Sequence, residues 1–195
     1  GHISVDGHCD DMIWSHRNVD WLNHYHYILL RDGNSVSDPY CNNWNARRGG
    51  TAMFQAIRNC NILIERIHEV RDLDTIEKKR WEAEAKFLKA YYHFYLLQQY
   101  GPIPIVRENI PVEASKDDVM AYREPVDEVF DYVISLINEA VPYLPLNIEN
   151  AISEQGRITQ ALALTVRAKI AVTAASPLFN GNTSYKSFKD KRNML

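Results

Sequence analysis

The sequence lacks both a long apolar run and a concentration of positive charge. No segment approaches the roughly 18 to 20 uninterrupted apolar residues that a membrane-spanning helix needs. The net charge of −3, without a run of Lys or Arg, gives no electrostatic footprint for nucleic acid or for an anionic membrane surface. These absences argue against nucleic acid as a partner and against a chain that itself crosses a bilayer.

Cysteine is also scarce, and its spacing is uninformative. Cys9, Cys41 and Cys60 are an odd number and show no CxxC pair, which argues against a zinc site and against a disulfide framework. Cys60 falls on an apolar helical stripe, so we expect a buried thiol there. His24 and His26 are two residues apart and lie on different helical faces, so they do not form a ligand pair. We expect neither a metal ion nor a cofactor.

Catalytic signatures are missing as well. The sequence contains no HExxH, GxSxG, GxGxxG or P-loop pattern. Glu82 and Glu84 stand among several lysines, and this mixture is typical of a solvated helix face rather than of paired catalytic carboxylates. The sequence therefore favours a protein that is not an enzyme and has no catalytic residues.

Helical periodicity is what the sequence does contain. Gly49-Gly50 precedes a run with apolar residues at steps of three and four, which predicts a helix over residues 51–70. Residues 75–100 carry two adjacent apolar stripes, so we expect neighbours on both sides of that helix. Gly101 and Pro102 end it, because glycine takes the left-handed cap conformation and proline cannot continue a helix. The aromatic residues expected in its core are Phe87, Tyr91, Phe94 and Tyr95.

Two further helices are predicted over residues 125–142 and 159–175, and a shorter one around Asp10 to Leu29. Thr159 is the expected N-cap of the last helix, whose many alanines permit close approach of its neighbours. The predicted fold is all-α, with stacked antiparallel helical hairpins of the tetratricopeptide kind. The loops are too uneven for a regular 34-residue repeat. We expect residues 1–195 to form a single domain.

Four segments in order resemble motifs of one family. Residues 84–106, EAKFLKAYYHFYLLQQYGPIPIV, resemble the E-A-x-F-L-R-A helix and Y-G-x-x-P-x-V loop of the SusD/RagB nutrient-binding lipoproteins of Bacteroidetes. Residues 56–61, 124–145 and 156–181 are similar to the family's other motifs, including G-R-x-T and A-A-S-P-L-x-N-G. Leu136 and the Leu162-Ala163 pair depart from the usual pattern.

The resemblance implies a non-catalytic role on the cell surface. Members of the family lie on the outer membrane over a SusC-like TonB-dependent transporter and bind glycans, or peptides in the RagB branch, for import. They are anchored by a lipidated cysteine, which here would lie upstream of Gly1. Because the family's members are much longer, the resemblance also implies that these residues are the N-terminal portion of a longer protein.

Stacked helical hairpins alone are equally compatible with a helical-repeat adaptor that binds only protein. An aromatic carbohydrate platform outside the core helices would distinguish a glycan-binding protein from such an adaptor. An enzyme with an unrecognised site is a third hypothesis, which no motif supports.

A candidate platform lies between Trp14 and Trp44, where aromatic rings stand among Asn and Asp residues. A sugar stacks its C–H face on an aromatic ring while its hydroxyls bond to side-chain amides. We expect Trp44 to pack on the helix that follows it. The residues predicted to bind ligand are Trp21, Tyr25, Tyr40 and Asn43.

Overall fold

The structure is a computed structural model that describes residues 34–183. The helix expected around Asp10 to Leu29, together with Trp21 and Tyr25, lies outside the described residues. Residues 34–183 contain helices and two isolated β-bridges, and no strand. The all-α prediction is therefore confirmed. The chain divides into two compact units, Gly1–Phe54 and Gln55–Leu195, which are described separately.

The predicted long helices are all present. The elements in chain order are α2 (Met53–Arg66), the 3₁₀ helix η3 (Ile67–Glu69), α3 (Thr75–Tyr100), α4 (Lys116–Val119), α5 (Val126–Ala140), the 3₁₀ helix η4 (Val141–Tyr143), α6 (Ala151–Glu154) and α7 (Gln160–Ala174). The short helices α4 and α6 were not predicted, because four residues are too few to show a helical period.

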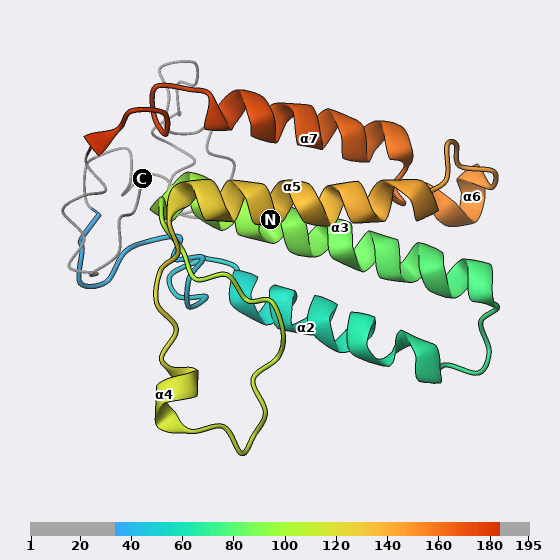
Figure 1. The fold of residues 1–195 in the computed structure, drawn as a ribbon, viewed down its shortest axis with the longest axis horizontal. Coiled ribbons are helices and arrows are strands. Elements are labelled where there is room, and N and C mark those ends of the chain that lie inside the picture. The colour runs from blue at the N-terminus through green and yellow to red at the C-terminus, as the bar shows by residue number, and fades with distance from the viewer. Residues whose placement is uncertain (1–33, 184–195) are drawn as a thin grey trace, which may run out of the picture. The chain divides into compact units, whose positions relative to one another are not determined.

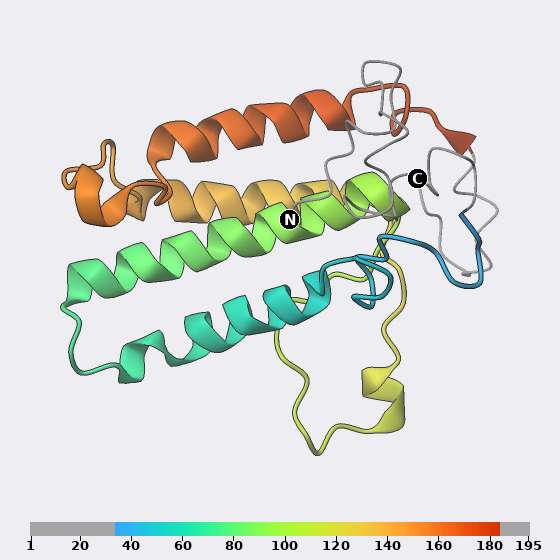
Figure 2. The same cartoon turned by 180° about the vertical axis from the view of Figure 1, so that it is seen from behind.

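Four helices lie side by side in the order α2, α3, α5, α7, and each runs antiparallel to the one before it (Figure 1). The view from behind shows the same order (Figure 2). α3 contacts α5, and α5 in turn contacts α7. This arrangement is the array of helical hairpins that the sequence predicts, with α3 covered on both sides.

Local signals set the helix ends. Asp74 caps α3, and its Oδ1 accepts hydrogen bonds from the backbone nitrogens of Ile76 and Glu77, both at 2.8 Å. Gly101 ends that helix with φ 66° and ψ −129°, a positive φ that favours glycine, although its ψ differs from the left-handed cap expected. The predicted N-cap Thr159 is confirmed, because its Oγ1 accepts from Leu162 N at 3.3 Å.

The core lies along α3 and α5. Phe87 and Phe94 are buried on α3, as predicted, and Cys60 is buried on α2. Tyr91 was expected in the core but is 41% exposed, so that prediction is wrong. Its ring stacks on Phe87 with centroids 6.4 Å apart, which places it at the edge of the apolar stripe. Tyr95 is half-buried.

The connection between α3 and α5 is long and extends away from the helices at α4 (Figure 1). Its beginning is anchored, because Ile103 is fully buried and its carbonyl accepts the N–H of Glu124 at 2.9 Å. Arg123 also donates to the carbonyl of Pro102 at 2.8 Å. Both ends of this connection are thus held at the C-terminal end of α3.

Candidate functional site

Tyr40 lies in a tight loop that precedes α2. The N–H of Cys41 donates to the carbonyl of Arg48 at 2.8 Å, and the N–H of Asn42 donates to Arg47 at 3.1 Å. Gly50 packs directly on this turn, since an added Cβ would lie 2.1 Å from the carbonyl oxygen of Asn42. The loop therefore depends on a glycine at that position.

The ring of Tyr40 is half-buried and held by a cation. Arg48 places its guanidinium carbon 4.9 Å from the ring centroid, and its Nη1 donates to the Tyr40 hydroxyl at 3.1 Å. Asp38 forms an ion pair with the same guanidinium. The backbone N–H of Tyr40 donates to Asn34 Oδ1 at 2.9 Å. The loop thus presents an aromatic ring beside an arginine and a carboxylate. Side chains of these three types are suited to bind sugars or peptides.

Asn43 lies in the same loop, where its hydrogen bonds hold the loop against the start of α2. It is 7% exposed, and its Oδ1 accepts the N–H of Thr51 at 2.7 Å. Its carbonyl oxygen accepts from Met53 N at 3.4 Å, at the first residue of α2. Trp44 packs edge-to-face on Phe54 with centroids 4.9 Å apart, as expected for a ring that holds the following helix. The structure therefore brings Tyr40 and Asn43 together in one loop.

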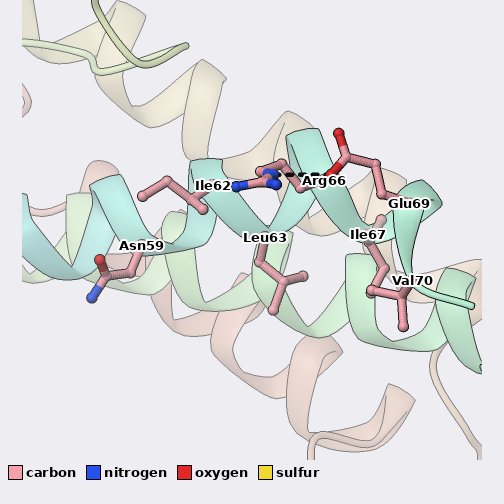
Figure 3. A pocket seen from close by; sticks show the side chains of 7 residues that line it. All are labelled: Asn59, Ile62, Leu63, Arg66, Ile67, Glu69 and Val70. Atoms are coloured by element: carbon pink, nitrogen blue, oxygen red, sulfur yellow. Dashed lines mark hydrogen bonds and ion pairs between the residues drawn. The ribbon is translucent and has the colours of Figure 1, made fainter. Parts of the chain in front are cut away.

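An apolar groove runs along α2 and η3 in the second unit, with a cavity volume of about 650 Å³. Figure 3 shows the side chains of Leu63, Ile67 and Val70 pointing to one side of the helix. An ion pair between Arg66 Nε and Glu69 Oε2, 3.0 Å apart, lies at its edge. Such a surface suits apolar side chains of a protein partner better than hydroxyl groups.

A more polar pocket of about 740 Å³ lies where the start of α3 meets η4 and α6. Tyr143 lines it with an exposed ring, and Lys79 Nζ lies 5.4 Å from the centroid of that ring. Arg80 and Glu154 line the same pocket and form an ion pair of 2.9 Å. Arg80 also pairs with Glu77 at 3.5 Å, so Glu77 and Glu154 both have a cationic partner in the pocket wall.

Glu84 belongs to this ion network, and the prediction of a solvated face is wrong for it. Its side chain is 13% exposed and accepts from Arg157 Nε at 3.0 Å. Arg157 also reaches Glu154 at 2.9 Å, and its guanidinium lies 5.1 Å from the ring centroid of Trp81. A hydrogen bond from Arg80 holds the pKa of the Glu154 carboxyl below its usual value. The network ties α3 to the segment before α7.

A buried polar cluster on α3 was not predicted from the sequence. His93 is fully buried; its Nδ1 lies 2.8 Å from the carbonyl oxygen of Lys89, and its Nε2 accepts the N–H of Val106 at 3.2 Å. Nδ1 therefore carries the proton. Lys89 is also buried, and its Nζ donates to the carbonyl of Arg107 at 2.6 Å.

Burial governs the titration of this cluster. It lowers the pKa of His93 to about 4 and that of Lys89 below its usual range. It raises the pKa of the Tyr132 hydroxyl to about 12, and the ring of Tyr132 packs edge-on against His93 at 5.4 Å. Both ring nitrogens of His93 are engaged by the backbone, so the cluster holds the chain that follows α3 rather than facing a substrate.

Residues 34–183 contain no group of three or more His, Cys, Asp or Glu that could hold a metal ion. Within the same residues, no helix combines the length and apolar character needed to cross a membrane.

Comparison with known proteins gives one consistent family. The model of a SusD-like family, described as starch-binding and associating with the outer membrane, matches residues 4–172. Among solved structures, BT4246 is 31% identical with a TM-score of 0.72, over 84% of this chain and 26% of that one. This chain thus spans about a quarter of the length of BT4246.

Two other solved structures are similar in fold. A surface glycan-binding protein A from Bacteroides uniformis is 22% identical with a TM-score of 0.63, over 81% of this chain and 32% of that one. A laminarin-binding SusD-like protein is 19% identical with a TM-score of 0.61, over 77% and 30% of the two chains. Among curated proteins, no relative matches.

Proposed function

Because the chain belongs to the SusD-like family, we propose that it is the N-terminal part of a longer, non-catalytic protein that binds glycan at the cell surface. Its task there is to capture an oligosaccharide for a SusC-like TonB-dependent transporter, from a lipid-anchored position on the outer membrane. The family match over residues 4–172 is the observation that carries the proposal. Two structural neighbours, a surface glycan-binding protein and a laminarin-binding protein, agree with it.

The proposed contribution of this chain to the glycan site is the loop at Tyr40 and Asn43, together with Trp21 and Tyr25. Tyr40 supplies a ring face for the C–H groups of a sugar, and Arg48 and Asp38 place charged hydrogen-bonding groups at its edge. Asn43 orients the loop through Thr51. A glycan is therefore expected to contact the ring of Tyr40 and the charged groups beside it.

Calorimetry of the full-length protein against a panel of oligosaccharides tests this site. Trp21→Ala, Tyr25→Ala and Tyr40→Ala are compared with Tyr122→Ala, which removes an exposed ring outside the segment. We expect at least one of the first three variants to bind more weakly than the parent, and the control to bind as tightly as the parent. All four should keep the parent's melting temperature. Equal affinity in all four variants would place the site elsewhere in the protein. Release of product from any oligosaccharide would contradict the non-catalytic role.

The proposed surface for the transporter is the groove of α2 and η3. It is apolar, and Ile62, one of the residues that line it, is 39% exposed. Ile62→Glu is expected to reduce the amount of outer-membrane barrel that co-purifies from detergent-solubilised membranes. The matched control is Ile152→Glu, because Ile152 is 99% exposed and lies outside the groove. Equal recovery of the barrel with both variants would rule out this docking face.

An adaptor that binds only protein is the second candidate function. The apolar groove of α2 and η3 favours it, because such a surface suits the side chains of a protein partner. A role of this kind needs no sugar site. The two functions separate in the calorimetry: an adaptor binds no oligosaccharide in the panel.

A further inference from the structure

The polar pocket at α6 differs in character from the apolar groove. It lies where the start of α3 meets η4 and α6 (Figure 1). We call it the α6 pocket. Its cavity volume of about 740 Å³ is typical of sites for small ligands. All its lining residues belong to the second unit, so the loop of Tyr40 is not part of it.

Hydrogen bonds and an ion pair hold the walls of the α6 pocket in place. The side-chain amide of Gln160 donates to the carbonyl of Leu144 at 2.9 Å, and its backbone N–H donates to the carbonyl of Pro145 at 2.9 Å. These bonds tie the segment after η4 to the first residue of α7. The pair of Arg80 and Glu154 joins α3 to α6. Because the walls are formed before a ligand arrives, little ordering opposes binding.

The α6 pocket offers an aromatic ring together with side-chain amides. Tyr143 is 52% exposed, which leaves its ring accessible to a ligand. Asn147 and Asn150 also line the pocket and are exposed. The Oδ1 of Asn150 accepts the N–H of Ile152 at 3.1 Å, so this side chain is held in place while its amide nitrogen is left to donate. A ring face next to amides suits a sugar, which combines a C–H face with hydroxyl groups.

The charges of the α6 pocket favour a neutral ligand. Glu77 and Glu154 are both paired with Arg80. In the described part of the chain, the lining charges that form no ion pair are Lys79 and Glu149. One is a cation and the other an anion, so an ion of either sign would meet a like charge as well as an opposite one. A sugar hydroxyl is neutral and both donates and accepts, so it suits an ammonium and a carboxylate together.

We propose that the α6 pocket is a second carbohydrate site, which takes a neutral oligosaccharide and is separate from the loop before α2. One sugar unit stacks on Tyr143, and its hydroxyls bond to the amides of Asn147 and Asn150. Lys79 donates to one hydroxyl, and Glu149 accepts from another. The inference rests on the proposed glycan-binding function and adds a second place on the chain where the same class of ligand is held.

Amine footprinting of the full-length protein tests the proposal. The exposed Lys79 is acylated under trace conditions, with and without heptasaccharides of starch, laminarin, xylan and mannan, and its labelling is measured by mass spectrometry. The control is Lys116, which is exposed on α4 and lies outside the pocket. A sugar at about ten times its Kd occupies roughly nine tenths of its sites. We therefore expect at least one heptasaccharide to slow the acylation of Lys79 about tenfold and to leave that of Lys116 unchanged.

Tyr143→Ala distinguishes the α6 pocket from other sites. We expect this variant to lose the protection of Lys79 and to keep the parent's melting temperature, because Tyr143 is exposed. Tyr40→Ala should leave the protection intact. If calorimetry detects a heptasaccharide that does not protect Lys79, or if Tyr143→Ala retains the protection, the α6 pocket is not a sugar site, while the glycan-binding function stands. If no heptasaccharide binds at all, the proposed function and this inference both fail.

Discussion

The imidazole Nε2 of His93 lies 3.2 Å from the backbone nitrogen of Val106, thirteen residues further along the chain. A histidine in the middle of α3 thus supplies the acceptor for a backbone N–H of the loop that follows the helix. This bond needs a neutral ring, because a protonated imidazole has no lone pair to accept it. The course of the chain after Gly101 therefore depends on the protonation state of one buried side chain.

We predict that stability falls as pH drops from 6.5 to 4. Burial lowers the pKa of folded His93 to about 4 from 6.5, and Lys89 and Arg107 also oppose a positive charge there. The unfolded chain binds a proton below pH 6.5 that the folded chain excludes, so the free energy of unfolding decreases until the folded pKa is reached. The expected loss from this residue is roughly 3 kcal/mol, measured by urea unfolding at several pH values.

His93→Gln is the control for this effect. Glutamine at position 93 does not titrate in this range. We therefore expect the variant to be less stable than the parent at pH 7, but to lose less stability between pH 6.5 and pH 4.5. An unchanged decrease in the variant would assign the pH dependence to other groups.

A second prediction concerns the core of α3. Phe94 is 2% exposed, so Phe94→Ala leaves a cavity and is expected to cost roughly 3 to 5 kcal/mol. Tyr91→Ala is the matched control, because it removes an exposed ring from the same helix, and we expect it to cost about 1 kcal/mol or less. Chemical denaturation of both variants measures the difference. Similar losses for the two would mean that burial does not determine their contributions.

The fold of the long helices followed from apolar periodicity and helix-end signals. The bounds of α3 agree with the prediction because Asp74 and Gly101 are local features of the chain. Burial of each ring could not be obtained in the same way. Tyr91 lies at the edge of the stripe that holds Phe87 and Phe94, and only the positions of the neighbouring helices decide that it faces outward.

Long-range polar contacts also could not be predicted from the sequence. Glu84 and Arg157 are 73 residues apart, and no local pattern indicates that they meet. For the candidate site, the sequence singled out the aromatic and amide residues of the segment before α2. It did not predict that Asn43 would bond to Thr51 or that Arg48 would cover Tyr40, because both contacts depend on the turn that closes the loop.

A third prediction concerns the ion network. Glu84→Gln keeps the shape of the side chain but removes the charge that faces Arg157 and Arg80, so both guanidiniums lose a carboxylate partner in a partly buried site. We expect a loss of about 1 to 3 kcal/mol. Glu69→Gln, in an exposed pair with Arg66, is expected to change stability by less than about 0.5 kcal/mol. Thermal unfolding in low salt compares them, and equal effects would contradict a structural role for the network.

The last prediction joins the loop at Tyr40 to glycan binding. In Gly50→Ala the new Cβ would lie 2.1 Å from the carbonyl oxygen of Asn42, so the turn that holds Tyr40 beside Arg48 must shift. The core along α3 and α5 belongs to the second unit, and we expect its unfolding midpoint to stay within error of the parent. If the loop forms the sugar site, affinity for the oligosaccharide found by calorimetry should fall about tenfold or more.

Gly181→Ala is the control for that variant. Gly181 has a positive φ of 81°, and an added Cβ meets nothing within 4 Å, so the substitution adds backbone strain without a clash. It lies outside the loop and should leave glycan affinity unchanged. Parent-like affinity in Gly50→Ala, with a loop shown by proteolysis to be altered, would exclude Tyr40 and its neighbours from the site. Loss of affinity in Gly50→Ala alone would tie sugar recognition to the geometry of this turn, because Gly181→Ala introduces its strain outside the loop.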